Sequence, residues 1–183
     1  MTFVFVQSCG LLNQAGEYNR FVNSTFKLEY LQILEIGGVD VSEMYSKSDL
    51  NVGEMLTLAG RVFSEEMPAK IKVYIEIENT SNEMAAISGL EWKLLMKEVE
   101  YANGILEDRV EVEPNSKVIF PVDAEIDLMK VFKSESLFDI LKLVFNINDE
   151  EQLRNLQLEL KIKPYYKSGS GLKKYPAYIS LKP

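Results

Sequence analysis

The sequence predicts a mainly β protein, a two-sheet antiparallel sandwich with two α-helices packed on it. Many segments alternate apolar and polar residues with a period of two, which is the pattern of a half-buried strand. Clusters of turn-forming residues separate these segments at short intervals. Two other segments carry apolar residues at helical spacing instead. Short strands with frequent turns and few helices favour a sandwich over the other layer architectures.

The chain enters its predicted β region at residue 26. Residues 26–30 alternate apolar and charged side chains, which indicates a first strand. Gly37-Gly38 then marks a turn, because glycine supplies the backbone conformations that tight turns require. Residues 39–42 alternate again and predict a short second strand.

The next segment is predicted to be helical. Its apolar residues recur at helical spacing and form one face, which comprises Val52, Met55, Leu56, Ala59, Val62 and Phe63. Ser48 or Asp49 is available as the N-cap, and Met67-Pro68 ends the helix.

The middle of the chain predicts strands separated by turns. The strands are residues 72–78, 87–96, 110–112 and 118–128, and the turns are 79–82, 103–104 and 114–116. Each of four residues lies on the apolar side of a predicted strand and is expected to face the space between the sheets: Ile75, Trp92, Phe120 and, from a later strand, Leu158.

The C-terminal part alternates between both kinds of element. A second helix is predicted over residues 134–145, followed by an acidic turn at 148–151. Residues 156–162 alternate and predict a strand that Pro164 closes. Residues 168–171 read Ser-Gly-Ser-Gly, a loop tip, and residues 178–181 predict the last strand.

Composition excludes several classes of function. The net charge of −8 repels phosphate backbones, so we expect no nucleic-acid partner. The chain has no histidine, so it has no Ser-His-Asp triad, no Cys-His pair and no imidazole metal ligand. One cysteine cannot form an internal disulfide. We therefore expect no cofactor, no metal site and no catalysis.

The first ten residues contain that single cysteine. The apolar run Phe3 to Val6 is followed by Ser8, Cys9 and Gly10. An apolar run, a small residue and a cysteine resemble the end of a bacterial lipoprotein signal peptide, and Ser-Cys-Gly before a polar segment is similar to lipoproteins of Bacteroidetes. The resemblance implies cleavage before Cys9 and diacylglycerol on its sulfur. The basic start of a secretory signal is absent. The alternative is an N-terminal strand with a buried thiol.

These expectations divide the chain into three parts. Residues 1–9 are a signal-peptide remnant that ends at the lipidated Cys9, residues 10–22 are a tether, and residues 23–183 are a single sandwich domain. The membrane, contacted through the lipid, is the expected partner. The expected location is the bacterial cell envelope, with the outer membrane favoured.

Part of the chain resembles the late-embryogenesis-abundant type 2 domain, also called the WHy domain. The matching pieces are Val73 to Glu78, Asn79-Thr80-Ser81-Asn82, Ser88 to Leu94, Asn103 to Leu106, and Pro114 to Leu128. Thr80-Ser81 stand where that family has a proline in an Asn-Pro-Asn turn. The resemblance implies an immunoglobulin- or fibronectin-like sandwich without a known catalytic centre, in a family associated with stress protection.

Four groups of residues are candidate chemical sites. Asp123, Glu125 and Asp127 share one strand face, with neighbouring carboxylates roughly 7 Å apart. Residues 148–151 are acidic but lack the glycine and spacing of a calcium loop. Both groups are expected to be solvated, and residues 168–171 are expected to be a hairpin tip rather than a phosphate loop. The fourth group is aromatic and basic and comprises Tyr165, Tyr166, Tyr175 and Tyr178 with Lys167, Lys173 and Lys174. Its tyrosines are expected to pack against the edge of the sandwich; the alternative is an exposed patch that contacts a glycan or a protein.

The expected function is a non-catalytic, lipid-anchored module that binds or protects something at the membrane surface. The alternative is a carrier that holds an acyl chain or another apolar ligand in a cavity of the sandwich. A third possibility is a hydrolase that uses carboxylates alone, which would require two acids converging in a cleft.

Overall fold

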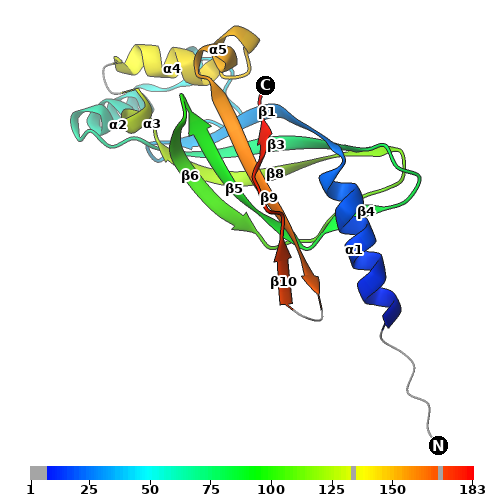
Figure 1. Cartoon of the computed structure of the whole chain (residues 1–183). Helices are drawn as coiled ribbons and strands as arrows, with labels where there is room; N and C mark the ends of the chain where they lie inside the picture. The colour runs from blue at the N-terminus through cyan, green and yellow to red at the C-terminus, as the bar shows by residue number, and fades with distance from the viewer. Residues whose placement is uncertain (1–7, 133–134, 169–170) are drawn as a thin grey trace, which may run out of the picture.

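The structure of the chain is a computed structural model that describes residues 8–132, 135–168 and 171–183. The side chains of residues 8–12, 150 and 152 are not among the described ones. The architecture is mainly β with antiparallel sheets, as the sequence predicts (Figure 1).

The first sheet has four antiparallel strands. Their order is β2 (Val39–Asp40), β1 (Thr25–Ile36), β3 (Pro68–Asn79) and β8 (Ser116–Asp127). The three long strands pair along almost their whole length, whereas β2 pairs with β1 only at Glu35 and Ile36. The outer edge of β1 is therefore left without a strand neighbour over most of its length.

The second sheet packs across the first. Its strand order is β10 (Gly171–Lys174), β9 (Leu158–Ser168), β5 (Gly89–Met96) and β6 (Val99–Leu106), with β11 (Ile179–Leu181) also paired to β9. A short separate ladder joins β4 (Ala85–Ile87) to β7 (Val110–Val112).

The helices gather at the two ends of the sheets. The described helical elements are α1 (Ser8–Val22), η1 (Lys47–Asp49), α2 (Val52–Phe63), α3 (Leu128–Val131), α4 (Leu137–Phe145) and α5 (Glu150–Asn155). Figure 1 shows α2, α3, α4 and α5 together at one end and α1 at the other. The two predicted helices, α2 and α4, are present, α1 occupies the segment expected to be a tether, and α3 was not predicted.

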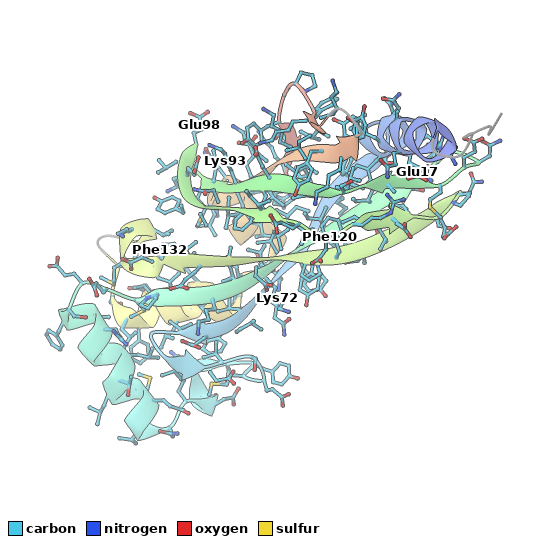
Figure 2. The ribbon with its side chains drawn as sticks, turned by 90° about the horizontal axis from the view of Figure 1, so that it is seen from below. Glu17, Lys72, Lys93, Glu98, Phe120 and Phe132 are labelled. Atoms are coloured by element: carbon cyan, nitrogen blue, oxygen red, sulfur yellow. The ribbon has the colours of Figure 1, made fainter. Side chains whose placement is uncertain are left out.

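The core lies between the sheets. Ile75, Trp92 and Leu158 are 0%, 6% and 2% exposed, which confirms the predicted inward face of their strands. Phe120 packs against this core but is only half-buried, because β8 is an edge strand (Figure 2). Its register partner on β3 is Ile75, so the two side chains share one face.

The segment expected to be a tether is a helix that belongs to the domain. Residues 10–22 lie within α1, and Tyr18 and Phe21 are 8% and 0% exposed. Phe21 contacts Phe26 of β1 edge to face, with ring centroids 5.5 Å apart. A helix of this length gains most of its stability from packing in the folded protein. The burial of the two aromatic rings therefore stabilises α1.

Two turns differ from the prediction. Asn103-Gly104 lies inside β6, where Gly104 faces Trp92 and a Cβ on it would come within 2.6 Å of the indole ring. The β5–β6 turn is formed instead by Lys97 and Glu98, both with positive φ. Pro164 lies within β9 rather than at its end.

The turn after β3 is organised by Asn79, which is 1% exposed. Its Nδ2 donates to the backbone oxygens of Glu83 (2.8 Å), Val112 (3.1 Å) and Glu113 (3.1 Å). Its Oδ1 accepts from the backbone N–H of Ser81 at 3.0 Å. One side chain therefore ties the predicted 79–82 turn to the end of β7.

The start of α2 also differs from the prediction. Asn51, not Ser48 or Asp49, is the N-cap, and it forms a capping box with Glu54. Its Oδ1 accepts from Glu54 N at 3.0 Å, while Glu54 Oε2 accepts from Asn51 N at 2.8 Å. This box fixes the helix to begin at Val52.

Candidate functional site

Cys9, the predicted lipidation site, falls in the first turn of α1. Its side chain lies outside the described residues, as does the apolar run Phe3 to Val6. No helix among the described residues is long and apolar enough to span a membrane. A lipid on Cys9 would therefore sit on the end of a domain helix rather than on a separate tether.

The rest of α1 is held firmly against the sheets. Arg20 Nε donates to the backbone oxygen of Met84 at 2.7 Å, and its Nη1 lies 2.6 Å from Glu83. About one turn closer to the N-terminus of α1, the carboxylate of Glu17 pairs with the guanidinium of Arg109 at 2.6 Å. Charge-assisted hydrogen bonds of this kind are the stronger ones in proteins, so α1 is attached at several points along its length.

The C-terminal tyrosines pack on the domain rather than form one exposed patch. Tyr165 is 5% exposed and donates its hydroxyl to the Leu106 oxygen at 3.3 Å. Tyr166 lies against Tyr18 of α1, with ring centroids 4.7 Å apart. Burial, with a smaller effect from Tyr175 and Tyr166, raises the pKa of Tyr18 to about 12.

Tyr178 is the exposed member of this group, at 36%. The ammonium groups of Lys93 and Lys163 lie 5.6 Å and 5.4 Å from its ring centroid, which is cation–π distance. Lys174 pairs with Glu91. These contacts all join residues on or next to the second sheet. The partners of the Tyr178 ring are therefore lysines of the chain itself.

The three carboxylates of β8 have separate roles. Asp123 is exposed and lies 3.8 Å from Lys72, and Glu125 is exposed on the same outer face. Asp127 is the N-cap of α3, and its Oδ1 accepts from Met67 N and Met129 N, each at 3.0 Å. The structure therefore uses Asp127 to join the end of β8 to the start of β3.

The acidic 148–151 segment is also structural. Asp149 Oδ1 accepts from Glu151 N at 3.0 Å at the start of α5, and the side chain of Glu150 lies outside the described residues. Asn148 reaches back to β1, where its amide bonds to Leu31. Across the described residues, no cluster of Cys, Asp and Glu is arranged to hold a metal ion.

The predicted loop tip at 168–171 joins β9 to β10 in a hairpin, and residues 169–170 lie outside the described part. In the hairpin, Ser168 pairs with Gly171 and Lys167 with Leu172. The element after this tip is the strand β10 and not a helix. A phosphate loop is followed directly by a helix whose N-terminus binds the phosphate, so this hairpin does not have that arrangement.

An apolar cavity lies between the sheets at the end that α4 covers. Its volume is about 30 Å³, close to that of one water molecule. Apolar side chains line it, among them Leu31, Ile71, Leu94, Phe132, Val144 and Leu158. An acyl chain needs a much larger space, since ligand pockets span roughly 300–1,000 Å³.

The strongest feature for function is the outer face of α2, which the sequence pattern assigned to the core. Leu58 is fully buried, and Met55 and Val62 are half-buried against the domain. Val52 and Phe63, in contrast, are 78% and 90% exposed. The apolar residues of α2 extend over more of the helix surface than one buried face can cover. That width is the feature of the sequence from which the exposed side could have been predicted.

Comparisons with known proteins give no family. No protein-family model matches the chain, and no curated protein matches it. Among solved structures, a protein from Archaeoglobus fulgidus aligns at 16% identity over 63% of this chain and 86% of its own, with a TM-score of 0.32. Northeast Structural Genomics Consortium target SoR45 aligns at 9% identity over 89% of each chain, with a TM-score of 0.39. At these TM-scores neither likeness assigns a fold family or a function to this chain.

Proposed function

We propose that this chain is a non-catalytic binding or protective module of the bacterial cell envelope, anchored through diacylglycerol on Cys9, with the outer membrane favoured. The fold we propose is an immunoglobulin- or fibronectin-like sandwich similar to the late-embryogenesis-abundant type 2 domain. The buried Asn79 turn supports this resemblance, because an asparagine occupies the matching position in that family's turn, and here its side chain hydrogen-bonds the backbone of Glu83 and Val112.

The observation that carries the proposal is the exposed apolar face of α2. It lies at the end of the molecule opposite α1, on which Cys9 is located (Figures 1 and 2). Large apolar side chains this exposed mark a contact surface when they share one face. An anchor at one end would present that surface away from the membrane, where a binding module needs it.

The arrangement of the acids supports a role without catalysis. Paired-carboxylate catalysis needs two acids facing each other, one of them with a raised pKa. Asp123 points outward beside Lys72, whereas Asp127 binds two backbone N–H groups. Neither is placed to share a proton with the other.

The carrier function is the second candidate, because the cavity between the sheets is lined by apolar side chains. Its volume of about 30 Å³ is far below that of a typical ligand pocket. A carrier would have to open by moving α4 away from the sheets. Native mass spectrometry of protein purified from its membrane would detect a co-purified lipid beyond the covalent anchor, and we expect none.

The anchor is tested by Cys9→Ala, with Ser8→Ala as the matched control because it keeps the cysteine and a small residue before it. We expect Cys9→Ala to move the protein from the membrane fraction to the soluble fraction, and Ser8→Ala to leave it membrane-bound. A Cys9→Ala protein still fully in the membrane fraction, or a Cys9 peptide without lipid mass, would refute the anchor.

A further inference from the structure

The last part of the chain is basic, whereas the rest of it is acidic. The whole chain has 20 lysines and arginines against 28 acids. Residues 158–183, which include β9, β10 and β11, contain six lysines and one acid, Glu159. The remaining residues therefore carry almost twice as many acids as bases. A separate basic segment in an acidic protein indicates a surface for an anionic partner.

Part of this basic segment projects beyond the second sheet. β5 pairs with β9 only as far as Tyr165. Residues 166–168 of β9 continue past that point, and their strand partners are residues 171–173 of β10. We call these six residues the hairpin end. Three residues of extended strand span about 10 Å, so the hairpin end extends well past β5. Two acids, Glu91 and Glu107, lie near Tyr165 and therefore behind it.

Two lysines and a leucine are exposed on the hairpin end. Lys167 and Lys173 are exposed, and no acid among the described residues forms an ion pair with either of them. Leu172 is 48% exposed, is the register partner of Lys167 and precedes Lys173. Lys174, in contrast, already pairs with Glu91. Lysines beside an exposed apolar side chain suit a lipid surface, where the ammonium groups meet phosphates and the apolar side chain enters the headgroup region.

The hairpin end lies at the same end of the molecule as the start of α1, the lower end in Figure 1. The two elements touch where Tyr18 of α1 meets Tyr166 of β9, with ring centroids 4.7 Å apart. From this contact α1 continues for nine residues to Cys9, about 14 Å, and β9 continues for two residues to Ser168, about 7 Å. The remaining difference is comparable to the length of an extended lysine side chain.

We propose that the hairpin end binds the anionic phospholipid headgroups of the membrane that holds Cys9, as a second contact beside the lipid. The position of the membrane at this end rests on the proposed anchor. Charge supports the same orientation, because the opposite end of the molecule is acidic. Glu54 lies in the first turn of α2, and the exposed Glu65 and Glu66 follow that helix. An anionic surface therefore attracts one end of the molecule and repels the other.

The contact orients the domain but does not anchor it. Each lysine near an anionic leaflet strengthens binding by about fivefold, and a few such side chains give only weak, reversible attachment. A lipid on Cys9 confines the hairpin end to the membrane surface and so raises its effective concentration there. The domain then stands with α2 directed away from the membrane, where the proposed binding module presents its exposed face.

The first test uses Cys9→Ala protein, which carries no lipid, and vesicles of phosphatidylcholine with or without phosphatidylglycerol. We expect binding only where phosphatidylglycerol is present, and its loss between about 0.1 M and about 1 M salt, because the Debye length falls from about 10 Å to about 3 Å. Lys167→Gln combined with Lys173→Gln should weaken binding about 25-fold, and Leu172→Ser should weaken it severalfold. Co-sedimentation with the vesicles measures each variant.

The matched control is Lys130→Gln combined with Lys182→Gln, which changes the net charge equally. The Lys130 side chain is 75% exposed in α3, which lies with α2. Lys182 is exposed and follows Leu181, which pairs with Leu160 at the other end of β9. We expect this variant to bind like the Cys9→Ala protein. The proposal is overturned by an absence of binding, by equal binding to both kinds of vesicle, or by a control that loses as much as the hairpin variant.

The second test reads the orientation on vesicles that contain phosphatidylglycerol, at saturating lipid. An environment-sensitive fluorophore is attached in the Cys9→Ala background at Leu172→Cys or, as the control at the opposite end, at Phe63→Cys, where the natural side chain is 90% exposed. We expect the emission to move to shorter wavelength only at position 172, because that position enters the headgroup region. A shift at position 63 as large as that at position 172 overturns the orientation.

Failure of this contact and failure of the proposed function give different results. A Cys9→Ala protein that ignores phosphatidylglycerol vesicles but binds an acidic polysaccharide or protein through Lys167 and Lys173 overturns the membrane contact and leaves the anchor intact. A natural protein without lipid on Cys9 refutes the anchor. If its Cys9→Ala form still binds the vesicles through Lys167 and Lys173, the headgroup contact is supported on its own.

Discussion

The side-chain amide of Asn148 takes the place of a neighbouring strand at Leu31 of β1. Asn148 Nδ2 donates to the Leu31 oxygen at 2.8 Å, and Leu31 N donates to Asn148 Oδ1 at 2.9 Å. This pair of bonds satisfies both backbone groups of a residue that is 4% exposed on a strand edge that β2 does not reach. It also fastens the segment between α4 and α5 to the first sheet.

Replacing this amide should expose the edge of β1. We expect Asn148→Ala to lower the free energy of unfolding by about 1–2 kcal/mol, because Leu31 loses both of its partners. Asn148→Asp keeps the acceptor but places a carboxylate oxygen against the Leu31 oxygen, so it should not recover the lost stability. Urea denaturation measures the loss, and hydrogen exchange should show the Leu31 amide losing protection in Asn148→Ala. Unchanged exchange at Leu31 would contradict this account.

Asn79 should be among the most sensitive polar positions of the chain. Asn79→Ala removes the donor for three backbone oxygens, and we expect a loss of about 2–3 kcal/mol in thermal or urea unfolding. Asn79→Asp should be at least as harmful, since its carboxylate would face those oxygens. Thr80→Ala, at the exposed neighbouring position, is the control and should change stability by less than about 0.5 kcal/mol.

Gly104 is needed by the ring of Trp92. We expect Gly104→Ala to destabilise the protein by about 1–3 kcal/mol, because a Cβ within 2.6 Å of Trp92 forces the ring out of its place. Trp92 is the only tryptophan, so a shift in fluorescence emission reports the displacement directly. Asn103→Ala is the neighbouring control, and a Gly104→Ala protein with native emission and stability would show that the ring does not depend on this glycine.

Tyr18 should make the protein sensitive to alkali. Burial raises its pKa from the ordinary 10.0 to about 12, so between these pH values the unfolded chain ionises while the folded one stays neutral. Its contribution to stability is complete below pH 10 and is lost as the pH rises towards 12. The stability advantage of the natural protein over Tyr18→Phe should therefore shrink between pH 9 and 11.5 in urea titrations. A constant difference would mean that Tyr18 ionises alike in both states.

The strands were predictable because their signal is local. Alternation along β3 and β8 reports one buried face, and Ile75 lies where the period of two places it. The β5–β6 hairpin was placed wrongly because Asn103-Gly104 is a common turn sequence, whereas Lys97 and Glu98 are not. Only the facing strand shows that Gly104 makes room for Trp92, and that information is not local.

The helices show a second limit. Spacing predicts that α2 is a helix, but the predicted face includes Phe63, which is 90% exposed, and omits Leu58, which is fully buried. Only packing shows which side of the helix is covered. The segment of α1 was interpreted as a tether because it is rich in polar residues, although Tyr18 and Val22 are spaced as one helix face. For Cys9, the proposed lipidation remains a prediction from the sequence.

The contact between α1 and β9 has a consequence for the order of folding. Tyr18 near the start of the chain bonds to the backbone oxygen of Pro164, which is 146 residues away. The helix therefore reaches its final place only after β9 has been synthesised and paired with β5. Contacts between such distant residues slow folding, because a long loop must close first. A chain that emerges N-terminus first, from a ribosome or a translocation pore, can place α1 against Met84 and Arg109 early, but it completes the contact of α1 with β9 only when almost all of it has passed.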